Sequence, residues 1–99
     1  MSTMVTKSVV ITHDVGLHAR PSVKLTKLAK GFGAKIEIAG NAAGPWVDAK
    51  SIVKVMAMKV RQNAELFVRA EGTSAAEAVD ALVDLVRRDF DEAAEHGTA

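Results

Sequence analysis

The sequence predicts a single α+β domain in which an antiparallel sheet is covered by helices on one face. Segments that alternate apolar and polar residues are interspersed with segments whose apolar residues recur at helical spacing, in the order β-α-β-β-α-β-α. Four short strands and three helices in a chain of only 99 residues favour this class. We expect one domain over residues 1–99, with its folded core at residues 5–93.

The N-terminal third is predicted to form a strand and then a helix. β-Branched residues dominate positions 7–14, which indicates a strand that Gly16 ends. Helical spacing then extends from Ala19 to Lys30. The residues that share the apolar face of this helix are Pro21, Ser22, Leu25, Leu28 and Ala29.

The middle of the chain is predicted to contain two strands and a short helix. Residues 34–40 alternate apolar and charged side chains, so that Ile36 and Ile38 lie on the buried face of a strand. A second, short strand follows a loop and covers residues 46–49. The compact apolar segment at residues 50–60 is interpreted as a short helix.

The C-terminal third is predicted to form a strand at residues 64–72 and a long helix at residues 73–95. Ser74 and Glu77 have the spacing of a capping box at the start of this helix. The buried face of the strand consists of Leu66, Val68 and Ala70. The apolar stripe of the helix consists of Ala78, Val79, Leu82, Val86 and Phe90.

The overall composition is that of a globular domain. Apolar residues make up 48% of the chain and the net charge is +1, so global charge predicts no strong affinity for nucleic acid. The absence of cysteine excludes disulfides and thiolate metal sites. Because the N-terminus is polar and no apolar run is long enough to span a bilayer, we expect a cytoplasmic protein without membrane insertion.

A histidine stands where the first helix is predicted to begin. Pro21 has no N–H and is tolerated only in the first turn, so the helix should start at Ala19 with His18 at its cap. The positive end of the helix would favour a phosphoryl group on the ring, and Arg20 could donate to the same oxygens. The alternative is an exposed or capping histidine without chemistry.

The segment "GLHARPS", followed later by "AKSIVKVM", resembles the HPr family, the histidine phosphocarriers of the phosphoenolpyruvate:sugar phosphotransferase system. The similarity runs from about Lys7 to Phe90. It implies an open-faced β-sandwich, in which a four-stranded antiparallel sheet is covered on one face by three helices. It also implies that enzyme I phosphorylates His18 on Nδ1 and that the phosphoryl group passes to IIA components, with Arg20 as the motif arginine.

Two departures from the family pattern are visible. The loop around Trp46, "AGNAAGPWVD", is slightly longer than usual. Lys59 occupies a position where many relatives carry glycine, so the exit from the short helix could bend differently. Neither departure touches His18, but both leave the exact partner open.

A docking surface for partners is predicted on the first and the short helix. Val23 is an apolar residue among lysines on the exposed side of the first helix, and apolar residues surround the short helix almost completely. An apolar patch with a rim of lysines would suit acidic partners, and the resemblance implies the same two helices. The alternatives are a solvated face and a fully buried short helix. The residues assigned to this docking surface are Val23, Lys24, Lys27, Lys30, Ile52, Val53 and Met56.

Ser51 is predicted to open the short helix as its N-cap. The resemblance adds a regulatory interpretation, because a dedicated HPr kinase/phosphorylase phosphorylates the matching serine in some relatives. A plain N-cap is the simpler of the two interpretations.

The remaining residues give weaker signals. His13 and His18 lack a third ligand at sensible spacing, so we expect no metal site and no cofactor. Trp46 is interpreted as a packing residue. A nucleic-acid-binding module is the alternative of another class, although only Phe67 could stack a base on the strands.

Two further alternatives are a regulatory carrier, which is close to the carrier function, and an enzyme, which is not. A regulatory carrier of the same family would serve a signalling branch instead of sugar uptake. An enzyme is disfavoured because no second catalytic group pairs with His18. We therefore expect a monomeric phosphocarrier that binds enzyme I and IIA components and does not bind nucleic acid.

Overall fold

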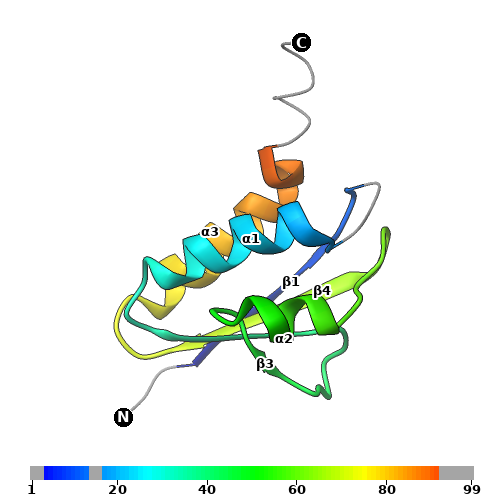
Figure 1. Cartoon of the computed structure of the whole chain (residues 1–99). Helices are drawn as coiled ribbons and strands as arrows, with labels where there is room; N and C mark the ends of the chain where they lie inside the picture. Colours follow the sequence, from blue (N-terminus) through cyan, green and yellow to red (C-terminus); the bar gives the residue numbers. More distant parts are fainter. Residues whose placement is uncertain (1–3, 14–16, 92–99) are drawn as a thin grey trace.

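The structure, a computed structural model, describes residues 4–13 and 17–91 (Figure 1). Its elements confirm the predicted order of four strands and three helices. They are β1 (Met4–Val10), α1 (Ala19–Lys30), β2 (Lys35–Ala39), β3 (Val47–Asp48), α2 (Ile52–Ala57), β4 (Glu65–Glu71) and α3 (Ala75–Arg87), followed by the 3-10 turn η1 (Asp89–Asp91).

The four strands form one antiparallel sheet in the order β1-β4-β2-β3, which confirms the predicted α+β class. The central strand β4 pairs with β1 on one side and with β2 on the other. Val68 lies opposite both Lys7 and Ile38, and the alternate residues Leu66, Val68 and Ala70 are buried as predicted. Both α1 and α3 lie on the same side of this sheet (Figure 1).

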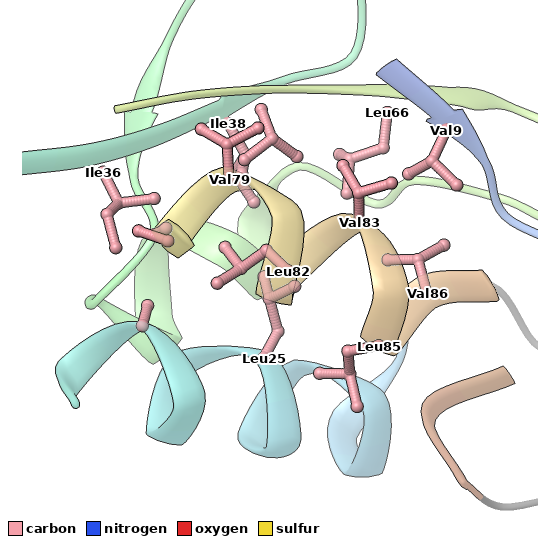
Figure 2. Close-up of a cluster of buried hydrophobic side chains, with 14 of the residues drawn as sticks. Val9, Leu25, Ile36, Ile38, Leu66, Val79, Leu82, Val83, Leu85 and Val86 are labelled. Atoms are coloured by element: carbon pink, nitrogen blue, oxygen red, sulfur yellow. The ribbon is translucent and has the colours of Figure 1, made fainter. Parts of the chain in front are cut away.

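The core lies between the sheet and these helices. Figure 2 shows Val79 and Val83 of α3 turned toward the strands and Leu85 turned toward α1. Leu25 of α1 is fully buried against the same cluster. The apolar stripe predicted for the last helix is confirmed for Ala78, Val79, Leu82 and Val86, which are completely shielded from solvent, whereas Phe90 is equally buried but lies beyond the end of the helix.

The strand β1 lies further toward the N-terminus than predicted. It extends from Met4 to Val10 instead of residues 7–14. Pairing explains the difference. The first residue of β1, Met4, lies opposite the last residue of β4, Glu71, and Val10 lies opposite Glu65, so the two antiparallel strands are paired over their full lengths. Gly16, predicted to end the strand, lies outside the described residues, as does position 14.

The last helix differs from its prediction at both ends. It ends at Arg87, and Asp89 and Phe90 then adopt φ angles of 57° and 56°, which break the helical path before residue 91. Residues 92–95 lie outside the described part of the chain. The predicted capping box is wrong, because Ser74 has a left-handed backbone (φ 61°) and its side chain makes no cap hydrogen bond.

The short helix α2 begins as predicted. The Ser51 hydroxyl accepts a hydrogen bond from the Lys54 amide at 3.4 Å, so Ser51 is the N-cap. Beyond the helix, Lys59 has a φ of 54°, a region that costs a residue with a side chain about 1–2 kcal/mol. Glycine, which the family resemblance suggests at this position, would adopt this turn without that cost. In this chain lysine adopts it instead.

Candidate functional site

His18 lies at the start of α1, as predicted. Its backbone is extended (φ −90°, ψ −166°), and its carbonyl accepts the first hydrogen bond of the helix from the Ser22 amide at 2.9 Å. The side chain is exposed and makes no cap hydrogen bond. The imidazole is therefore presented to solvent and to any partner that docks at this end of the helix.

The first turn of α1 is suited to an anion beside the imidazole. The amides of Ala19 and Arg20 have no carbonyl partner within the helix, and Pro21, which has no amide hydrogen, is buried as the third residue. The turn contains no acidic residue. Because a helix N-terminus acts as about half a positive charge, a phosphoryl group on His18 would lie in a favourable field. Arg20 is exposed in this same turn.

The backbone that carries His18 is fixed by its neighbours. The amide of the buried residue Leu17 donates to the Val60 carbonyl at 2.9 Å. The hydroxyl of Ser22, itself fully buried, donates to the Leu17 carbonyl at 3.2 Å. The segment before His18 is thus tied both to the chain just after α2 and to the second turn of α1. Helical spacing predicted that Ser22 is buried but gave no sign of these bonds.

The apolar residues of the predicted docking surface are exposed to different extents. Val53 is 75% exposed, and Val23 and Met56 are each 40% exposed, whereas Ile52 is half-buried. Val55, on the other side of α2, is fully buried in the core. The short helix therefore combines a buried side with an apolar side that faces solvent.

The lysines of α1 are not equivalent. Lys27 and Lys30 are exposed in the last turn, about 14–18 Å along the helix axis from His18 at 1.5 Å per residue. Lys24 is half-buried, and its ammonium donates to the Phe90 carbonyl at 2.9 Å. Lys24 therefore ties α1 to the turn that follows α3, a contact across 66 positions that sequence spacing could not indicate.

His13 and Trp46 have packing roles. His13 is 6% exposed and meets the Phe90 ring edge-on, with 5.9 Å between ring centres. Among the residues that the structure describes, no three metal-ligating side chains gather in one place. The guanidinium of Arg69 lies over the Trp46 ring, with 4.0 Å between its Cζ atom and the ring centre. Arg69 also forms an ion pair with Glu37, with 2.9 Å between Nη2 and Oε1.

The outer face of the sheet does not suit nucleic acid. Phe67, the aromatic residue predicted as a base-stacking candidate, is only half-exposed there. The strand pairing places it on the same face as two basic residues, Lys35 and Arg69, and a larger number of acidic residues, so the net charge of this face would repel a phosphate backbone. These acidic residues are Glu37, Asp48, Glu65 and Glu71. In the described part of the chain, no helix has the length and hydropathy of a membrane span.

Comparison with known proteins shows that this chain is similar to HPr phosphocarrier proteins. A family model described as "PTS HPr component phosphorylation site" matches residues 5–88. The phosphocarrier protein HPr of Cupriavidus necator is 37% identical over 89 residues, which cover 90% of this chain and 98% of that protein. HPr of Mycoplasma capricolum is 40% identical over 75 residues, covering 76% of this chain and 82% of the relative.

A solved structure, HPr-C-His from Thermoanaerobacter tengcongensis, superposes on this chain with a TM-score of 0.81 at 33% sequence identity. The superposition covers 88% of this chain and 96% of the other. The two chains therefore share the same fold over nearly their whole lengths.

Proposed function

This chain belongs to the HPr family of phosphocarrier proteins, and we propose that it carries its phosphoryl group on His18. As a member of that family it is a carrier within the sugar phosphotransferase system and not itself an enzyme. The exposed imidazole at the start of α1, which makes no cap hydrogen bond, supports the assignment most directly. Incubation with phosphoenolpyruvate and enzyme I, followed by intact-mass measurement, tests it.

The proposed reaction is an exchange of one phosphorus bond for another. The lone pair of Nδ1 of His18 attacks the phosphoryl group that enzyme I holds, so that a nitrogen–phosphorus bond forms as the bond to enzyme I breaks. A IIA component later takes the group by the same step in the other direction. The first-turn amides and the guanidinium of Arg20 stabilise the phosphoryl oxygens during both transfers.

Arg20→Ala is expected to slow phosphoryl transfer about 10- to 100-fold, because a hydrogen bond to a charged group contributes about 1.5–3 kcal/mol. Arg20 is exposed, and an interaction of an exposed charged side chain contributes at most about 1 kcal/mol, so the free energy of unfolding should change by no more than about 1 kcal/mol. Stopped transfer reactions analysed by mass measure the rate, and urea unfolding measures stability. A large loss of stability with an unchanged transfer rate would show that Arg20 is structural.

We further propose that enzyme I and IIA components dock on the surface formed by α1 and α2. Val53→Glu and Met56→Glu should each weaken the affinity for enzyme I at least about tenfold, because each places a charge on an apolar contact facing an acidic partner. Titration calorimetry measures the affinity. Ala76→Glu, which adds the same charge on the exposed side of α3, is the matched control and should bind as the wild type. Equal binding by all three variants would contradict the proposal.

Ser51 is proposed as a latent phosphorylation site within this docking surface. Aspartate caps a helix as well as serine does, so Ser51→Asp should stay folded. Its charge should repel an acidic partner and slow phosphorylation by enzyme I about tenfold at low salt, with recovery at high salt. Ser51→Asn, a neutral cap of the same size, is the control. If Ser51→Asp is phosphorylated at the wild-type rate at low salt, Ser51 lies outside the docking surface.

A further inference from the structure

A cavity of about 300 Å³ lies between α2 and the loop that leads into β3. Figure 1 shows α2 lying beside β3, where this loop returns to the sheet. Pro45 and Val47 form the wall on the loop side, and Met58 and Val60 form the wall on the side of α2. Among the described residues that line it, Lys54 is the only charged one. The cavity is thus an apolar pocket with a single ammonium group.

The loop wall of this pocket is held in place. The backbone carbonyl of Asn41 accepts a hydrogen bond from the Gly44 amide at 3.0 Å. The side-chain oxygen of Asn41 accepts another from the Ala43 amide at 3.0 Å. Just beyond Pro45, Trp46 is stacked against Arg69 on the outer face of the sheet. The wall is therefore fastened at both ends, and the pocket is formed before any ligand arrives.

The segments that line the pocket carry more positive than negative charge. Residues 40–47 contain no charged side chain, and residues 49–64 contain four basic residues and no acidic one. Of these four, Lys54, Lys59 and Arg61 are exposed, whereas the Lys50 ammonium is bound to the Phe32 carbonyl at 2.8 Å. The nearest acid along the chain, Asp48, accepts a hydrogen bond from the Lys50 amide. A ligand with negative charge would be attracted to the pocket entrance.

We propose that this pocket binds one large apolar side chain from an acidic segment of a partner protein. A volume of about 300 Å³ is at the lower limit for small-molecule sites and suits a single phenylalanine or leucine side chain. Lys54 would pair with a carboxylate that flanks the apolar residue. Buried apolar anchors of this kind dominate the binding energy of protein interfaces.

The pocket is continuous with the exposed side of α2 but separate from His18. Lys54 and Met58, one turn apart, face the pocket, and Val53 and Met56 lie on the exposed side of the same helix. A partner that covers Val53 could therefore place an adjoining side chain in the pocket. Peptide binding in the pocket does not require that His18 accept a phosphoryl group, so this inference and the proposed function can fail independently.

An NMR titration of the ¹⁵N-labelled full chain tests the proposal with two synthetic peptides. The probe is acetyl-Glu-Asp-Phe-Asp-Glu-amide, and the control peptide has serine in place of phenylalanine. The amide signals of Gly40, Gly44 and Ala57 should shift with the probe, and the control peptide should bind at least tenfold more weakly. Lys54→Gln should weaken probe binding and reduce its dependence on salt.

Two glycine variants test whether the pocket itself is the site. A Cβ atom at Gly40, which lines the pocket, would meet no atom within 4 Å, so Gly40→Leu adds a side chain at the pocket wall without a clash and should hinder entry of the probe. Gly33→Leu is the matched control, because its Cβ also meets nothing within 4 Å and Gly33 does not line the pocket. Gly40→Leu should bind the probe at least tenfold more weakly, and Gly33→Leu should bind it as the wild type.

Three results would overturn the proposal: equal binding of the two peptides, signal shifts confined to residues outside the pocket, or unchanged binding by Gly40→Leu. If Gly40→Leu fails to fold, Ala57→Leu enlarges a side chain at the pocket wall on the α2 side and is judged by the same criterion. His18→Ala should bind the probe normally. A chain that binds the probe but is never phosphorylated would refute the phosphate assignment and leave the pocket proposal intact.

Discussion

His18→Ala is expected to abolish phosphorylation by enzyme I completely. The ring supplies the atom that we propose to accept the phosphoryl group from enzyme I, and alanine has no nucleophile. Folding should be unaffected, because the imidazole is exposed and makes no cap hydrogen bond. The free energy of unfolding should therefore change by no more than about 0.5 kcal/mol. Intact-mass measurement after incubation with phosphoenolpyruvate and enzyme I gives the result directly.

The label on the wild-type chain should also have the chemistry of phosphohistidine, which is labile in acid and stable in alkali. His96→Ala, a change in the C-terminal residues, is the control and should be labelled fully. Complete labelling of His18→Ala would show that another residue is the acceptor.

Phe90→Ala is expected to produce the largest loss of stability. Phe90 is completely buried, and its ring contacts the edge of His13, so truncation leaves a cavity beside a second buried ring. Such substitutions cost about 3–5 kcal/mol, whereas small domains have a total stability of about 5–15 kcal/mol. Urea unfolding measures the difference. Val53→Ala, which truncates a 75% exposed side chain, should change stability by no more than about 0.5 kcal/mol.

The folded fraction of Phe90→Ala should still be phosphorylated. The bond from the Lys24 ammonium goes to the backbone carbonyl of residue 90, which the substitution keeps. A loss of less than about 1 kcal/mol would mean that the ring does not belong to the core.

Local patterns predicted α1, α3 and β4 well because each of these elements has one buried face. The buried residues Leu66, Val68 and Ala70 alternate along β4, and this period of two identifies the strand. Pro21 is tolerated only in the first turn of a helix, and this identifies the start of α1. The position of His18 at the helix start follows from the same reasoning. These features depend on residues within one or two turns of each other.

The features that the sequence did not predict depend on distant partners. The length of β1 is determined by β4, which lies more than 50 residues away. The left-handed residues Asp89 and Phe90 end α3 earlier than its apolar stripe suggests, and no glycine marks that point. Likewise, the Lys24–Phe90 bond and the pocket beside α2 arise only when separate segments pack together.

The attachment of Leu17 to Val60 and to Ser22 has a consequence for the working cycle of the carrier. Neither of these bonds involves the His18 ring, so we expect the backbone at His18 to keep its position when the ring is phosphorylated, and the carrier to exchange partners without a change of shape. Release must then come from weak binding. At an association rate of ~10⁷ M⁻¹s⁻¹, a dissociation constant of ~10 μM corresponds to departures ~100 times per second. A tighter complex would make the carrier's residence on each partner the slow step of phosphoryl flow.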